Sequence, residues 1–108
     1  MRRHLKLIIC FCVLLNLLAL LKYSEHNIDL LLTDVIMTGQ DGPELALTIL
    51  RENPSLKVLF MSGYAPDTFQ HFFDGMTGYT YIHKPFDSAA LEKSIRGVLD
   101  SDNTLSRA

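Results

Sequence analysis

The stretch from residue 28 to residue 34 reads IDLLLTD, a nearly continuous apolar run that ends in the carboxylate of Asp34. Such a run is typical of a parallel strand that is buried on both faces. Two further runs have the same character, KVLFMS at 57–62 and YTYIH at 79–83, and the first stops at Gly63 while the second stops at Lys84-Pro85. The sequence therefore predicts three buried strands, at 28–34, 57–62 and 79–83.

Helical patterns lie between and after these strands. Asp41-Gly42-Pro43-Glu44 is a helix start in which Asp41 caps and Glu44 reaches back, and Asn53-Pro54 ends that helix. A weaker helix is expected from Pro66 to about Phe73, and Asp87 or Ser88 caps a final helix with one apolar face. Strands that alternate with helices at this spacing predict right-handed βαβ units and therefore an α/β fold with a parallel sheet and flanking helices.

Length and charge narrow the possible functions. The chain has 108 residues, which is enough for one domain, and 48% of them are hydrophobic, as in an ordinary globular protein. Residues 1–24 carry four basic side chains and no acidic one, whereas residues 25–108 carry six basic and twelve acidic side chains. An acidic body argues against nucleic acid as a partner. Cys10 and Cys12 are interpreted as small buried hydrophobes.

Three polar residues mark the carboxyl ends of the predicted strands: Asp34, Ser62 and Lys84. Ligands of parallel sheets bind outside these ends. A carboxylate can accept a phosphoryl group, an ammonium can offset the charge, and a hydroxyl can donate to a phosphoryl oxygen. Taken singly, each residue is more often a cap, a turn former or a solvated side chain. Their coincidence in one sheet indicates a phosphoryl site.

The sequence motifs around these residues resemble those of a known family. Asp34-Val35-Ile36-Met37 followed by Asp41-Gly42, then 60–64 (FMSGY) and 83–86 (HKPF), resemble the signature segments of the receiver domain of bacterial two-component response regulators. The sequences of these motifs are most similar to those in receivers of hybrid sensor histidine kinases, and the resemblance covers about residues 18–100. It implies a flavodoxin-like fold, phosphorelay signal transduction, a cytoplasmic location and no enzyme activity.

The resemblance also implies roles for individual residues. Asp34 would be the phosphoacceptor, Ser62 the switch hydroxyl, Lys84 the phosphate-sensing lysine and Tyr81 the switch aromatic. Asp34 and the backbone carbonyl of Ile36 would be ligands of Mg²⁺, and the Lys84–Pro85 peptide would be cis. The partner implied is a histidine kinase or a phosphotransfer domain.

Two departures from the family pattern change the expectation. Thr38 stands where the family usually has proline, and no acidic residue precedes Glu25, so the family's acidic metal-binding pair is absent. With only Asp34 and one carbonyl as ligands, we expect weak Mg²⁺ binding and impaired phosphoryl uptake. The sequence resembles an incomplete receiver at 18–108, in which an apolar leader at 1–17 replaces the first strand, helix and strand.

The sequence allows several structures for this leader. Residues 7–21 read LIICFCVLLNLLALL, preceded by the basic MRRHLK. The favoured prediction is one continuous helix; the alternatives are a strand near Leu5–Cys12 followed by a helix, and a membrane anchor, although fifteen helical residues span only roughly 22 Å. We expect the leader to cover the exposed strand at 28–34, either as a neighbouring strand or as a helix, unless a homodimer does so.

Three other functional hypotheses stand beside the phosphorelay receiver. The first is a degenerate receiver that acts as a phosphorylation-independent interaction module. The second is a small membrane-anchored protein, and the third is a gene fragment without a selected function.

Overall fold

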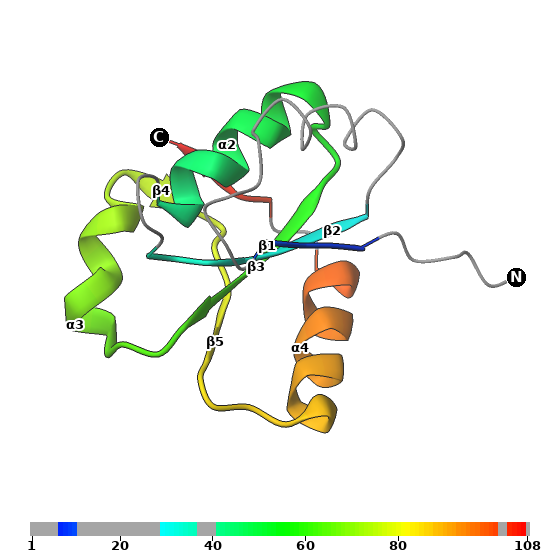
Figure 1. Cartoon of the computed structure of the whole chain (residues 1–108). Helices are drawn as coiled ribbons and strands as arrows, with labels where there is room; N and C mark the ends of the chain where they lie inside the picture. The colour runs from blue at the N-terminus through cyan, green and yellow to red at the C-terminus, as the bar shows by residue number, and fades with distance from the viewer. Residues whose placement is uncertain (1–6, 11–28, 37–40, 102–103, 108) are drawn as a thin grey trace, which may run out of the picture.

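The computed structural model describes residues 7–10, 29–36, 41–101 and 104–107, and its core is a parallel sheet (Figure 1). The sheet has the strand order β1-β2-β3-β5, made of β1 (Leu7–Cys10), β2 (Leu30–Asp34), β3 (Lys57–Ser62) and β5 (Tyr81–His83). All three strand pairs are parallel. The three strands predicted from the sequence are therefore confirmed, with β2 and β5 each two residues shorter at the amino end than predicted.

Helices lie on both faces of this sheet: α2 (Gly42–Glu52) covers one and α4 (Ser88–Asp100) covers the other (Figure 1). The side chain of Asp41 accepts a hydrogen bond from the backbone N–H of Glu44, and that of Asp87 accepts one from the N–H of Ala90. Asp87 is thus the cap of α4, and the alternative cap, Ser88, is the first residue of the helix. The weaker helix predicted at 66–73 is split into α3 (Pro66–Phe69) and a 3₁₀ helix, η1 (Gln70–Phe73).

Alternate side chains of the central strands supply two hydrophobic clusters, one for each face. Leu31, Val58 and Phe60 pack with Leu45, Ala46 and Ile49 on the α2 side. Leu30, Leu32, Leu59 and Met61 pack with Val98 of α4 on the other side. Because both faces of β2 and β3 are covered, both strands are nearly continuous apolar runs, as the sequence predicts.

The amino-terminal segment departs from the favoured prediction. A continuous helix over residues 7–21 is wrong at residues 7–10, which form β1 and pair with β2 in the register Leu7↔Leu30 to Cys10↔Thr33. The alternative of a strand beside residue 28 onward is the one found there, because an unpaired edge of β2 would leave its backbone donors and acceptors unsatisfied. Residues 11–28 lie outside the described part of the chain. Among the described residues, no helix is long and apolar enough to cross a membrane.

A small two-stranded sheet was not predicted from the sequence. It pairs β4 (Met76–Thr77) with β6 (Ser106–Arg107) in antiparallel fashion. Each strand has two residues, so neither shows the alternation from which a strand is recognised in a sequence.

Candidate functional site

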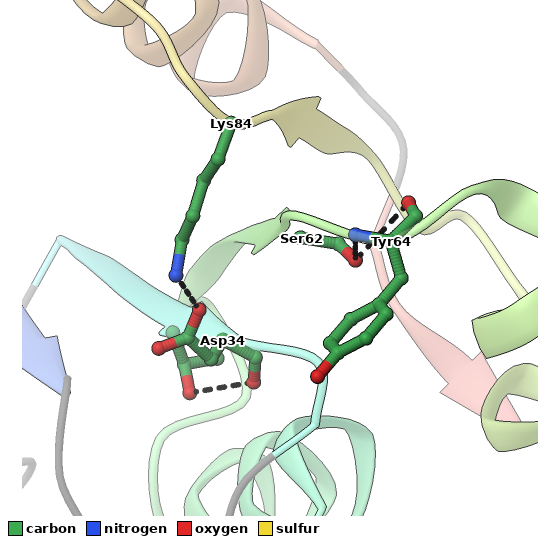
Figure 2. A network of polar contacts seen from close by, with 5 residues as sticks. Asp34, Ser62, Tyr64 and Lys84 are labelled. Carbon is green, nitrogen blue, oxygen red and sulfur yellow. Dashed lines mark hydrogen bonds and ion pairs between the residues drawn. The ribbon is translucent and has the colours of Figure 1, made fainter.

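The three strand-end residues come together at the carboxyl edge of the sheet (Figure 2). Asp34 is the last residue of β2, Ser62 is the last of β3, and Lys84 follows β5 directly. The backbone N–H of Lys84 donates to the carbonyl of Ser62 at 2.8 Å, which extends the pairing of β3 with β5 by one residue. The Lys84–Pro85 peptide is cis, as the resemblance implies.

Asp34 and Lys84 form an ion pair. The Nζ of Lys84 lies 2.5 Å from Oδ1 of Asp34, and Figure 2 shows the lysine side chain extended from the end of β5 towards the carboxylate. The Asp34 side chain is 15% exposed and that of Lys84 is 40% exposed. The carboxylate is therefore accessible to a reactant from solvent while its charge is already balanced from one side.

The backbone around Asp34 is held by its neighbours. The N–H of Val35 donates to the carbonyl of Met61 at 3.0 Å, and the N–H of Gly42 donates to the carbonyl of Val35 at 2.7 Å. A Cβ atom at Gly42 would lie 2.0 Å from the carbonyl oxygen of Asp34, so only glycine allows α2 to begin this close to the strand end. The sequence predicts Gly42 only as part of a helix start. Its contact with Asp34 could not be predicted, because it depends on how closely α2 approaches the end of β2.

Ser62 is brought to the site, but its hydroxyl faces its own loop. Ser62 is 3% exposed, and its Oγ accepts a hydrogen bond from the N–H of Tyr64 at 3.0 Å and donates to the carbonyl of Tyr64 at 3.4 Å (Figure 2). The hydrogen bond from this hydroxyl to the Tyr64 carbonyl must break before the hydroxyl can donate to a group on Asp34. The part played by Tyr64 has no signal in the sequence, because the bonds involve only its backbone.

Tyr81 lies at the surface next to the site. Its side chain stands in β5, opposite Phe60 of β3, and the residue is 39% exposed. Its ring contacts that of Phe69 edge to face, with 5.0 Å between the centroids. The structure thus places Tyr81 on the strand that precedes Lys84, with its ring in contact with Phe69 and the residue partly exposed.

The ligands that the described residues offer do not fit a complete Mg²⁺ site. Octahedral magnesium is usually held by one or two carboxylates together with other oxygen ligands. In the ranges that the structure describes, no group of three or more His, Cys, Asp or Glu side chains is arranged to hold a metal. Asp34 and the half-buried Ile36 lie two residues apart in the loop after β2, and Asp34 is the one carboxylate placed there by the strand.

A parallel α/β sheet with an ion-paired aspartate at its carboxyl edge defines a receiver-type domain, and comparison with known proteins identifies the family. Residues 14–96 match the family model described as response regulator receiver domain. The chain belongs to this family. It is a receiver domain of two-component signalling.

Two curated relatives come from Brucella abortus (strain 2308). The response regulator receiver protein CpdR is 32% identical over 78 residues, which cover 72% of this chain and 65% of CpdR. The sensor kinase CckA is 29% identical over 77 residues, which cover 71% of this chain but only 8% of the kinase. The chain therefore spans less than two thirds of the length of either relative.

Solved structures show the same fold. One is a two component transcriptional regulator AraC from Clostridium phytofermentans ISDg, with a TM-score of 0.63 and 28% identity. The match covers 89% of this chain and 96% of that one. A response regulator receiver protein from Sinorhizobium medicae WSM419 has a TM-score of 0.65 at 16% identity, with 90% of this chain and 96% of that one covered. At such low identity the second likeness shows the fold alone.

Proposed function

We propose that Asp34 accepts a phosphoryl group from a histidine kinase or a phosphotransfer domain, and that its uptake is weaker than in a receiver with a full set of acidic residues. The observation that carries the proposal is the ion pair between Lys84 and Asp34 at the carboxyl edge of the sheet. Membership of the receiver family supports a histidine kinase as the partner. Because that partner uses cytoplasmic ATP, the proposed location is the cytoplasm.

The proposed step is a transfer between two covalent carriers. A carboxylate oxygen of Asp34 attacks the phosphorus of a phosphohistidine, a P–O bond forms, and the P–N bond breaks. The electron pair of the broken bond returns to the imidazole, which takes up a proton from water. The product is an acyl phosphate on Asp34, with negative charge spread over three oxygens.

Two side chains would stabilise that product. The ammonium of Lys84, already within contact distance of the carboxylate, would offset the added charge. Ser62, once turned away from the Tyr64 backbone, would donate its hydroxyl to a phosphoryl oxygen. Tyr81, half-exposed beside the site, would then report the change on the protein surface.

Weak uptake follows from the metal ligands. In complete receivers, Mg²⁺ neutralises the transferring group, and here Asp34 and the carbonyl of Ile36 are the ligands proposed for it. A metal held by one carboxylate leaves more of the transition-state charge unbalanced. More of the neutralisation then falls to Lys84.

Labelling with acetyl phosphate tests the proposal. The wild-type chain, Asp34→Asn and the control Asp100→Asn are incubated with this donor and Mg²⁺, and intact mass is measured. Asp100 is an exposed carboxylate at the end of α4, so its amide variant keeps the site intact. We expect partial labelling of the wild type and of Asp100→Asn, and none of Asp34→Asn. Label that persists in Asp34→Asn would contradict the proposal.

A second candidate function is a receiver that binds partners without being phosphorylated. It is favoured by the absence of an acidic cluster from the described residues. A folded wild-type chain that takes no label from acetyl phosphate or from a phosphorylated histidine kinase would rule out the first function and leave this second one.

A further inference from the structure

The segment that follows α4 passes from one layer of the fold to the other. Helix α4 packs on the sheet face that contains Leu59, whereas Leu105 is buried to 6% exposure in the cluster on the opposite face, together with Phe73 and Met76. At the start of this crossing, the Nζ of Lys57 donates to the carbonyl of Ser101 at 2.7 Å. Leu105 is therefore part of the core on the α2 side.

Residues 104–107 also fit closely against β4. Met76 pairs with Arg107 and Thr77 with Ser106, and the hydroxyl oxygens of Thr77 and Ser106 lie 3.1 Å apart. Gly78 has a φ of 77°, and a Cβ atom there would lie 2.3 Å from the carbonyl oxygen of Thr104. Residues 104–107 are therefore held against β4 by backbone pairing and by the burial of Leu105. Gly78 leaves room for the Thr104 carbonyl to approach.

The strand β4 lies in the middle of an aromatic network. Phe73, which precedes β4, stacks on Tyr79, which follows it, with centroids 4.1 Å apart. Phe73 also contacts Phe69 at 6.1 Å, and Phe69 contacts Tyr81 at 5.0 Å. The residues that flank β4 are therefore linked through Phe73 and Phe69 to the ring of Tyr81.

We propose that residues 104–107 form a C-terminal strap that controls how readily the segment from η1 to β5 opens, and with it the packing of Tyr81. The strap is local: it holds β4 through one buried side chain and a two-residue ladder, and its release leaves the strands β2 and β3 paired. Local openings of this kind occur well below the free energy of global unfolding. A partner that captures residues 104–107 would therefore loosen the Tyr81 side of the domain without touching Asp34. The inference does not depend on phosphorylation of Asp34.

Hydrogen exchange of the full chain tests the strap. In Leu105→Ala, we expect the amides of residues 76–82 to exchange at least about tenfold faster than in the wild type, relative to the amides of residues 30–34 in the same protein. Leu105→Met, which keeps the volume, and Thr104→Ala, which alters an exposed side chain of the strap, should exchange like the wild type.

Two outcomes would overturn the inference. Equal acceleration in residues 76–82 and 30–34 would show that Leu105 is an ordinary core residue, and unchanged exchange in both would show that the strap restrains nothing. If Leu105→Ala does not fold, Leu105→Val replaces it, with an expected acceleration of about threefold in residues 76–82 alone because only one methylene is lost.

Discussion

At the residue scale, the site depends on the ion pair of Asp34 with Lys84 and on a glycine that lets the start of α2 approach Asp34. Asp34 and Lys84 meet across the end of β3, because β2, β3 and β5 all end at the same edge of the sheet, and Gly42 lets α2 start against the Asp34 carbonyl. The placement of Asp34 and Lys84 at one edge could be predicted from the sequence, because polar residues at the ends of parallel strands share an edge. The contact of Gly42 and the loop bonds of Ser62 could not, since both depend on distances between segments.

Gly42→Ala tests this close approach. The new methyl group would meet the Asp34 carbonyl oxygen at 2.0 Å, so the strand end and the helix must separate. We expect a loss of about 1–3 kcal/mol in the free energy of unfolding, measured with urea, from this overpacking. Gly97→Ala is the matched control: nothing lies within 4 Å of its Cβ position in α4, and alanine there should stabilise by roughly 0.5–1 kcal/mol. Equal stability of the two variants would contradict the account.

At the scale of elements, strands were easier to predict than the ends of the chain. The apolar runs in β2 and β3 follow from burial on both faces, and the capping residues of α2 and α4 follow from their side-chain oxygens. The segment 7–10 was predicted as part of a helix because leucine-rich runs fit a buried helix as well as a buried strand. Residues 7–10 form a strand because they pair with β2, which is a tertiary contact that the local sequence does not reveal.

Helix α4 offers a direct test of its cap. Asp87→Ala removes the acceptor of the Ala90 N–H and should lower the free energy of unfolding by about 1 kcal/mol. Ser88→Ala, one residue later and inside the helix, should change it by less than about 0.5 kcal/mol. If Ser88→Ala costs more than Asp87→Ala in urea unfolding, the cap is assigned to the wrong residue.

Strand β1 makes the leader part of the fold. Deletion of residues 1–17 removes the partner of β2 and exposes its edge and apolar side chains to water, at a cost of ~25 cal/mol for each Å² of apolar area. We expect the shortened chain to aggregate or to lose cooperative unfolding, as measured by light scattering and circular dichroism. A monomeric, cooperatively folded product would show that the leader is dispensable.

At the scale of the whole molecule, the described residues form a parallel receiver-type sheet with the Asp34–Lys84 pair at its edge, and they contain no cluster of three or more side chains that could hold a metal. The family, the fold class and the partner class follow from short motifs that the sequence carries intact. The domain boundary at residue 17/18 and the roles of Asp34, Ser62, Tyr81, Lys84 and Ile36 stay predictions. Motifs report residue types, whereas metal affinity and phosphoryl uptake depend on the summed charge and geometry of the site.

Metal binding measures that summed charge. In calorimetric titration with MgCl₂, we expect no saturable 1:1 binding at concentrations that saturate a receiver carrying the acidic pair, because one carboxylate holds magnesium weakly. Such a complete receiver, titrated in the same buffer, is the control. Tight 1:1 binding by this chain would mean that a further acidic ligand completes the site.

The most direct test of the central claim is to locate the phosphoryl group chemically. An acyl phosphate is reduced by borohydride, which converts an aspartate so modified to homoserine, whereas phosphate esters of serine or threonine are not reduced. The chain is labelled with acetyl phosphate, reduced, digested and analysed by mass spectrometry. We predict homoserine at position 34 and at no other aspartate. Phosphate retained on a hydroxyl residue, or homoserine at another position with Asp34 unmodified, would contradict the account.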